Sequence, residues 1–401
     1  MNLLTDGIQN NSVIKTGTAR KITVDGITKA YTVYKIRLDL LFYNDQNDRI
    51  STWISQYKNE NDGQIPSISD KEAYNSVIED FIIKSNPTAI KATKTNIELV
   101  DQREPGVVLK DGRIIDGNRR FTCLRQLAEK NERFQYMEAI ILEHDIENSA
   151  KQIKMLELQI QHGEESKVDY NPVDKLVGLY KDVEVTKLLT LEEYAKSVNA
   201  TVREVSKQLE IANYMVEFLE FINASGQYYL VRDMQIIHAF EELPKMLNKC
   251  GTDDEKEDLK HIVFTNLLVK PEADVRRMVR NINKIAGTEF AASFIEEQID
   301  ITENVIEKLP DKVNESVIRD VIRTNDEVIS ALENSTEKAI TKVNRTETKN
   351  RPIQLAEKAT MYMESIDNNI LLKMNDSELR RLDRQLSRLE SVIEEIRRDM
   401  K

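Results

Sequence analysis

The sequence predicts an α+β protein, in which a small mixed sheet domain is followed by a mainly α-helical body and a C-terminal helix of the coiled-coil type. Strand-like runs rich in β-branched and aromatic residues occur only in the first third of the chain. Beyond Asn171-Pro172 helical periodicity dominates, and only 12 Gly and 8 Pro interrupt a chain of 401 residues. A chain of this length suggests several domains.

Composition excludes several function classes. A net charge of −12 argues against a protein whose whole surface coats nucleic acid. Two cysteines cannot form a disulfide framework, so we expect a reducing, cytoplasmic location. No run of about 18 apolar residues occurs, so no membrane-spanning segment and no membrane partner are expected.

The first predicted domain covers residues 1–165. Alternating apolar residues from Ala30 to Phe42 predict a strand, and Asp25-Gly26 before it is a hairpin turn signal. Apolar residues at helical spacing predict a helix over Asp70–Lys84, with Pro87 shortly past its end. Two short strands are expected around the turn at Asp111-Gly112.

The most informative segment follows these strands, where Asp116-Gly117 leads into a helix that begins at Asn118. A glycine at this position lets the backbone approach a ligand closely, and the first amides of the helix favour anions. Arg119 and Arg120 oppose the helix dipole in the first turn, a cost that a bound phosphate would remove. The alternative is that both arginines pair with surface carboxylates and that the glycine only shapes the turn.

Local charge supports the ligand hypothesis. Residues 101–133 contain eight basic and six acidic side chains, an excess opposite in sign to the charge of the whole chain. The excess is small, so it indicates a local anion site and not a basic surface.

These residues carry a resemblance to a known family. The segments that match are Val107-Val108, Asp111-Gly112, Ile114–Phe121 and Leu124, with Leu38–Ile50 before them and Asp169–Val173 after them. Together they resemble ParB/sulfiredoxin-like domains. The resemblance implies that CTP or ATP binds here, with its phosphates on Gly117, Asn118, Arg119 and Arg120. It also makes Asn47, Arg49 and Asp116 further candidates for the nucleotide site.

Two departures from the family pattern restrict what the resemblance implies. Asn118 stands where sulfiredoxins place their reactive cysteine, so sulfinic-acid repair is not expected. The Glu-Asn pair of partition proteins is not reproduced, which leaves Glu157 as the candidate ligand for an accompanying Mg²⁺. The alternative for Glu157 is a solvated glutamate on a helix surface.

The second predicted domain covers residues 166–250. A helix over Val173–Tyr180 precedes a helix-turn-helix pattern, in which Asn199 takes the left-handed turn position and Thr201 caps the second helix. The pattern resembles the helix-turn-helix that follows the nucleotide domain in partition proteins. That resemblance makes DNA a conditional partner, with Arg203, Ser206, Lys207 and Gln208 as the DNA-binding residues.

Charge limits this DNA hypothesis. Residues 166–250 contain ten basic and thirteen acidic side chains, so one copy alone should bind DNA weakly. Avidity in a dimer would compensate, and an ordinary turn between packed helices is the alternative.

Two helical segments complete the chain. Residues 251–351 form a predicted helical domain to which the sequence assigns no role. Residues 352–401 are a predicted helical hairpin or dimerisation segment, whose last helix is capped by Asp376 or Ser377. Its apolar residues recur at alternating three- and four-residue steps, namely Leu379, Leu382, Leu386, Leu389, Ile393, Ile396 and Met400. This heptad seam predicts a homodimer, and the alternative is a helix folded back on its own chain.

The leading hypothesis is therefore a nucleotide-dependent DNA-binding switch of the ParB type, with slow CTP or ATP hydrolysis as an option. A second hypothesis is a metal-dependent nuclease or phosphotransferase on the same fold, with Asp116, Glu104 and Glu157 as its carboxylates. A third is a structural adaptor, for which the two arginines of the turn would be dispensable.

Overall fold

The computed structural model describes residues 2–24, 27–144, 146–163 and 171–400. The chain divides into two compact units, Met1–Thr336 and Glu337–Lys401. The predicted segments 1–165 and 166–250 both lie within the first unit, and the predicted segment 251–351 crosses the boundary between the units. Asp25, Gly26, Asp169 and Tyr170, which contribute to the predictions above, lie outside the described residues.

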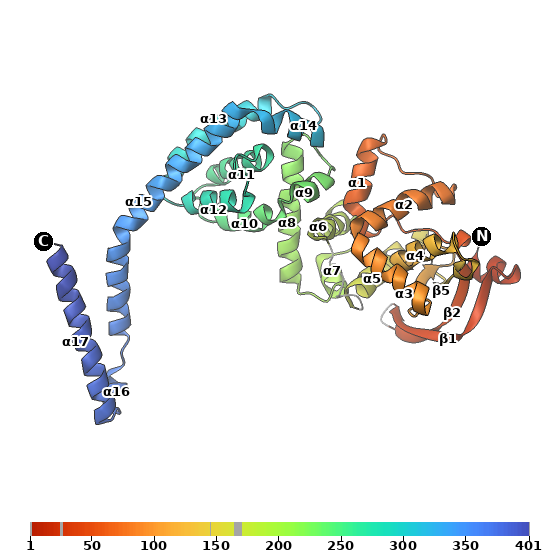
Figure 1. The fold of residues 1–401 in the computed structure, drawn as a ribbon, viewed down its shortest axis with the longest axis horizontal. Helices are drawn as coiled ribbons and strands as arrows, with labels where there is room; N and C mark the ends of the chain where they lie inside the picture. Colours follow the sequence, from red (N-terminus) through yellow and green to blue (C-terminus); the bar gives the residue numbers. More distant parts are fainter. Residues whose placement is uncertain (1, 25–26, 145, 164–170, 401) are drawn as a thin grey trace. The chain divides into compact units, whose positions relative to one another are not determined.

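The predicted α+β fold is confirmed. A five-stranded mixed sheet has the order β1 (Val13–Val24), β2 (Ile27–Arg37), β5 (Tyr136–Leu142), β3 (Gly106–Leu109) and β4 (Ile114–Asp116) (Figure 1). β3 and β5 run parallel, and the other neighbouring strands run antiparallel. All strands of the described chain precede the helical body, as the sequence predicts.

The sheet is covered on both faces, because successive residues of a strand point to opposite sides. Val108 packs in one core with residues of α2 (Lys71–Ser85), α3 (Pro87–Val100) and α4 (Asn118–Ala128). Its neighbour Val107 packs in a second core with Leu156 and other residues of α5 (Ile146–Gly163). The short inner strands are therefore buried on both sides.

One predicted boundary in this region is wrong, and one helix was not predicted. The strand predicted up to Phe42 ends at Arg37, because Leu38–Leu40 forms a 3-10 turn and Phe42 makes only an isolated bridge to Arg113. The helix α2 is confirmed, with Asp70 as its N-cap. The proline at its end, however, is the first residue of α3, a position where its fixed φ and missing N–H suit a helix.

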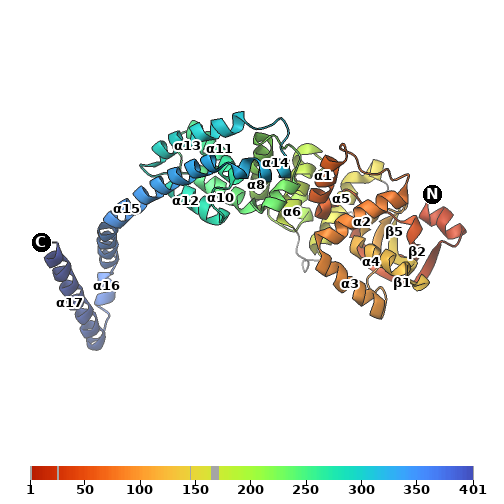
Figure 2. The ribbon, with the colours of Figure 1, turned by 45° about the horizontal axis from the view of Figure 1, so that its top comes forward.

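The rest of the chain is helical. Its helices are α1 (Ser51–Glu60), α6 (Pro172–Tyr180), α7 (Leu191–Ser197), α8 (Val202–Phe221), α9 (Tyr229–Met234), α10 (Ile237–Leu247), α11 (Asp253–Val269), α12 (Val275–Ile285), α13 (Ala291–Glu307), α14 (Glu315–Asp320), α15 (Asp326–Glu364), α16 (Asn368–Leu371) and α17 (Asp376–Asp399) (Figure 2). Helices α8, α10 and α11 pack together through three aromatic rings. The ring centroids of Phe218, Phe240 and Phe264 lie 5.5 to 6.2 Å apart. Among the described helices, none is long and apolar enough to span a bilayer.

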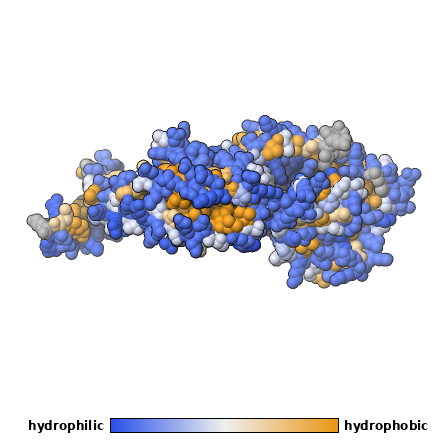
Figure 3. All heavy atoms as spheres, turned by 90° about the horizontal axis from the view of Figure 1, so that it is seen from above, coloured by the Kyte–Doolittle hydropathy of each residue, from blue (hydrophilic) through white to orange (hydrophobic). Residues whose placement is uncertain are grey.

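The surface of the molecule is mainly polar. Figure 3 shows one face of the molecule, on which hydrophilic side chains predominate and hydrophobic ones gather mainly over the helical body. With 31% charged residues, such a surface is expected.

A buried ionic cluster joins the sheet domain to the helical body. Lys154 of α5 lies 2.7 Å from the Asp48 carboxylate and 3.4 Å from the Asp182 carboxylate, and all three side chains are buried. Gly178 of α6 makes room for this cluster, since a Cβ on Gly178 would lie 2.3 Å from Cγ of Asp48. A buried charge that loses its partner destabilises a protein by about 3 to 5 kcal/mol.

We expect Gly178→Ala to destabilise the protein, although alanine normally stabilises a helix interior by about 1 kcal/mol relative to glycine. The new methyl group would displace Asp48 from Lys154, so the free energy of unfolding should fall by about 2 kcal/mol or more. The measurement is urea unfolding followed by circular dichroism. Gly17→Ala is the matched control, because nothing lies within 4 Å of its added Cβ. Equal effects of the two substitutions would contradict the role of Gly178.

Candidate functional site

A cavity of ≈ 240 Å³ opens at the N-terminus of α4. Its walls are formed by Asn47, Arg49, Ile82, Ser85, Thr93, Glu104, Ile115, Asp116, Gly117, Asn118, Arg119, Arg120 and Gln161. The structure thus brings together every residue that the sequence assigned to the nucleotide site, from the loop before α1 to the first turn of α4. Glu157 and the four predicted DNA-binding residues are not among the residues that line this cavity.

The turn before α4 has a geometry that requires glycine. Gly117 is the N-cap of α4, with φ of 104° in the left-handed region. An added Cβ would meet Cε of Met137 at 2.7 Å. Because Gly117 has no side chain, it gives the amides of the first turn no capping partner. These amides and the positive end of the helix dipole therefore face the cavity as an anion site.

Asn118 and Gln161 place side-chain amide oxygens in the cavity. The side chain of Asn118 lines the cavity and is only 7% exposed. Its Oδ1 is buried and accepts no hydrogen bond from any residue that the structure describes, and the same holds for Oε1 of Gln161. A buried acceptor without a donor costs about 1 to 3 kcal/mol. These two oxygens are therefore hydrogen-bond acceptors on the cavity wall.

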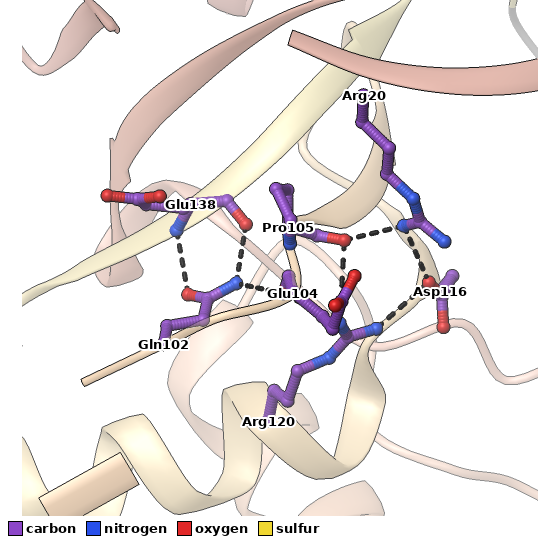
Figure 4. Close-up of polar contacts among 7 residues, drawn as sticks. All are labelled: Arg20, Gln102, Glu104, Pro105, Asp116, Arg120 and Glu138. Atoms are coloured by element: carbon purple, nitrogen blue, oxygen red, sulfur yellow. Dashed lines mark hydrogen bonds and ion pairs between the residues drawn. The ribbon is translucent and has the colours of Figure 1, made fainter. Parts of the chain in front are cut away.

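Asp116 is held between two arginines (Figure 4). Its Oδ2 accepts hydrogen bonds from Arg20 Nη1 at 3.0 Å and from Arg120 Nη2 at 2.9 Å. Burial would raise the pKa of Asp116, but the charges of Arg120 and Arg20 outweigh it and hold the pKa below its ordinary value. The carboxylate therefore stays ionised and fixes β1, the end of β4 and the first turn of α4 to one another.

The same contacts define the role of Arg120. Besides Asp116, its guanidinium donates to the backbone carbonyls of Glu104 at 2.7 Å and Pro105 at 3.4 Å. Asp116, four residues earlier, also offsets the cost of a positive charge at the helix N-terminus. For Arg120 the structure matches the alternative that it pairs with a carboxylate. Arg119, its neighbour in the sequence, also lines the cavity.

The loop that carries Glu104 is anchored to the sheet. Gln102 donates to the carbonyl of Glu138 at 2.6 Å and accepts from the amide of Glu138 at 2.8 Å, as a neighbouring strand would (Figure 4). Its Nε2 also donates to the carbonyl of Glu104 at 2.8 Å. The carbonyls that hold Arg120 are therefore fixed by a third element, β5.

The loop before α1 presents alternate residues to the cavity. Asn47 caps the short turn Asp48–Ile50 by accepting from the amide of Arg49 at 3.0 Å. Asn47 and Arg49 line the cavity, whereas Asp48 between them joins the buried cluster with Lys154. This loop is thus shared by the cavity and by the junction with the helical body.

Three polar residues of the cavity wall were missed by sequence reasoning. Ser85 and Thr93 come from α2 and α3, and no local signal points to them because α3 itself was not expected. Gln161 follows Glu157 by four residues, so it lies on the same helix face as a residue that was considered. That spacing is the one signal that could have found it.

Glu157 is neither on the wall of the cavity nor on a solvated helix surface, the two places that the sequence analysis considered. It is buried, and its two carboxylate oxygens accept hydrogen bonds from Gln161 at 3.0 Å and Asn44 at 3.4 Å. Burial, together with the negative charges of Asp48 and Asp182, outweighs the nearby Lys154 and raises the pKa of Glu157 to about 8. Within the described ranges, no group of three His, Cys, Asp or Glu side chains is arranged to hold a metal ion. These surroundings do not fit a Mg²⁺ ligand.

The helix-turn-helix geometry agrees with its prediction. α7 and α8 pack together, Asn199 has φ of 54°, and Thr201 and Glu204 form a reciprocal capping box. Arg203, Ser206 and Lys207 are exposed on the first two turns of α8, and Gln208 is half-buried. These side chains are accessible to a macromolecular partner.

The sequence matches no known protein-family model, and a comparison with curated proteins finds no similar protein. The resemblance to ParB/sulfiredoxin-like domains therefore stays a prediction.

The raised pKa of Glu157 predicts a pH-dependent stability. A carboxyl group whose pKa is higher in the folded state than in the unfolded state stabilises the protein at low pH. That contribution is lost as the pH rises from about 4 through about 8. We expect Glu157→Gln to reduce the loss of stability between pH 5.5 and pH 9 by about 1 kcal/mol or more.

Urea unfolding at each pH measures this effect. The control is Glu241→Gln, which changes an exposed glutamate on α10. If both variants follow the wild-type pH dependence, Glu157 is not the titrating group.

Proposed function

We propose that the protein is a nucleotide-dependent DNA-binding switch, in which the N-terminus of α4 holds the phosphates of CTP or ATP. The observation that carries this proposal is the cavity at Gly117, where the uncapped N-terminal end of α4 lies beside the side chains of Arg49 and Arg119. Amides and arginines at a helix N-terminus are donors that suit phosphate oxygens.

The size and lining of the cavity suggest which part of the nucleotide would lie inside it and which part outside. At ≈ 240 Å³ the cavity is smaller than typical small-molecule sites of roughly 300 to 1,000 Å³. It would enclose the phosphates and leave the base at its mouth. Arg49 and Arg119 would supply charge, and the amide oxygens of Asn118 and Gln161 would accept from hydroxyl or amino groups. Because Glu157 does not fit a metal ligand, Mg²⁺ would enter with the phosphates that bind it.

The DNA part of the proposal rests on α8. Its N-terminal side chains are donors that suit phosphates and base edges in a major groove: Arg203, Ser206 and Lys207 are exposed, and Gln208 is half-buried. Because the surrounding segment is acidic, two copies in a homodimer would be needed for useful affinity. Nucleotide binding would change how the two subunits present these helices.

The other two hypotheses find less support. A metal-dependent nuclease needs a carboxylate cluster, but Asp116 is bound by two arginines and Glu157 lies in a separate buried cluster. A structural adaptor gives no reason for the unpaired Asn118 oxygen in the cavity. Slow hydrolysis of a bound nucleotide is compatible with the binding switch.

Arg119→Ala should weaken nucleotide binding at least tenfold, because it removes a charge from the cavity wall without touching the Asp116 contacts. Isothermal titration with CTP, ATP and GTP, each with and without Mg²⁺, measures the affinity. Arg103→Ala is the matched control, since Arg103 is exposed, lies in the same region and does not line the cavity. A folded wild-type protein that binds none of the three nucleotides would remove the proposed function.

Replacing Arg203 and Lys207 by Ala should weaken DNA binding across sequences and lower the slope of log affinity against log salt by about 2. Fluorescence anisotropy with duplex DNA at several salt concentrations measures both quantities. The control variant carries Arg103→Ala and Lys21→Ala, which remove the same charge from exposed positions elsewhere. Equal salt slopes for the two variants would place the DNA contact somewhere other than α8.

A further inference from the structure

Most of the apolar seam of α17 is exposed, since of its seven residues only Leu382 is half-buried. None of residues Asp376–Asp399 is buried within the part of the chain that the structure describes. Leu386 and Leu389 are each 37% exposed, and Ile396 is 55% exposed. The cap of this helix is Asn375, one residue before the predicted Asp376 or Ser377, because its side chain accepts from the amides of Ser377 and Glu378. A capped helix with a regular exposed seam is typical of a coiled coil that lacks its partner.

The spacing of the seam fixes the heptad positions. The a positions are Leu379, Leu386, Ile393 and Met400, and the d positions are Leu382, Leu389 and Ile396. The flanking e positions are then Asp383, Glu390 and Arg397, and the g positions are Glu378, Gln385 and Val392. Charges at e and g choose the orientation of the partner helix, because they meet across the seam.

In a parallel pair of helices, like charges at the e and g positions would face each other. In a parallel dimer each g residue meets the e residue of the next heptad on the other helix. Glu378 would then face the partner's Asp383, twice in the dimer by symmetry. Gln385 would face the partner's Glu390, and Val392 would face the partner's Arg397. The parallel arrangement contains two like-charge contacts and no ion pair across the seam.

In an antiparallel pair, ion pairs outnumber like-charge contacts across the seam. In this pair Leu379 meets the partner's Ile396, Leu382 meets the partner's Ile393 and Leu386 meets the partner's Leu389. Two-fold symmetry repeats each contact, which gives six apolar layers. In that register e residues meet e residues, so Asp383 faces the partner's Arg397 at two symmetric places. Glu390 faces the partner's Glu390 once, at the centre. Two ion pairs against one like-charge contact favour this orientation.

We infer that α17 binds α17 of a second copy of this chain in the antiparallel orientation. The inference rests on the homodimer of the proposed function and adds its geometry. Residue 376 of one helix would lie level with residue 399 of the other, so the two N-terminal ends would be roughly 35 Å apart at a rise of 1.5 Å per residue. The two chains would therefore enter the coil at opposite ends.

Cysteine cross-linking of the full chain tests the orientation. All variants carry Cys250→Ser, because Cys250 is partly exposed whereas Cys123 is buried. Gln385→Cys places two thiols beside the antiparallel two-fold axis, so a disulfide dimer should form under mild oxidation. Leu379→Cys places them at adjacent a positions of a parallel pair but roughly 26 Å apart in the antiparallel pair. Here no disulfide dimer should form.

The outcomes separate the orientation from the dimer itself. A disulfide at residue 379 and none at residue 385 would overturn the antiparallel inference and leave the homodimer standing. A monomer in sedimentation equilibrium, with no disulfide at either position, would remove both, and would favour a helix folded back on the exposed Ile353, Leu355 and Tyr362 of α15. Nucleotide titration of the same samples shows separately whether the proposed function holds.

Charge substitution gives a second test with opposite expectations for the two orientations. Asp383→Arg places the new arginine against the partner's Arg397 in the antiparallel pair, so the dimer dissociation constant should rise about tenfold. In the parallel pair it would meet the partner's Glu378, and the dimer would tighten. Adding Arg397→Asp should restore the antiparallel dimer, with helix content checked by circular dichroism. A tighter dimer for the single variant would overturn the inference.

Discussion

The architecture around the cavity depends on one carboxylate, that of Asp116, whose side chain is only 11% exposed. Asp116 accepts from Arg20 of β1 and Arg120 of α4, so the edge strand, the end of β4 and the helix N-terminus are tied at a single point. A buried carboxylate costs several kcal/mol unless it is paired, and here two arginines pair with it. The position of the Gly117 turn, and with it the direction of the first amides of α4, follows from this contact. If phosphates bind there, as proposed, these contacts hold the first turn of α4 in place for them.

A second constraint connects the cavity to the helical body. The loop before α1 turns Asn47 and Arg49 toward the cavity and Asp48 toward Lys154 and Gly178. Arg232 of α9 reinforces the junction from the body, since its guanidinium lies 3.7 Å from the ring centroid of Trp53 on α1. A ligand that shifts this loop would strain a cluster of buried charges whose geometry admits little adjustment. That coupling gives the proposed switch a physical route from the phosphates to α6 and α8.

Sequence reasoning succeeded where the determinants are local. The left-handed Asn199, the Thr201 cap, the strands around Asp111-Gly112 and the helix from Asn118 each follow from a few neighbouring residues, and each is observed. It failed where partners are distant in the chain. No residue near Asp116 predicts its contact with Arg20, which lies 96 residues away. The raised pKa of Glu157 depends on its burial and on Asp48 and Asp182, which come from other elements. The cavity lining was therefore predicted on one side only, while Ser85, Thr93 and Gln161 required the tertiary structure.

The central claim is that phosphates bind to the first turn of α4. Amide chemical shifts of Asn118, Arg119 and Arg120, recorded while CTP or ATP is added, test it directly, because hydrogen bonds from these amides to phosphate oxygens move their proton resonances downfield. The account predicts that these three amides shift together at saturation, and that inorganic triphosphate reproduces most of the change. Nucleotide binding that leaves all three resonances in place, while other residues shift, would contradict it.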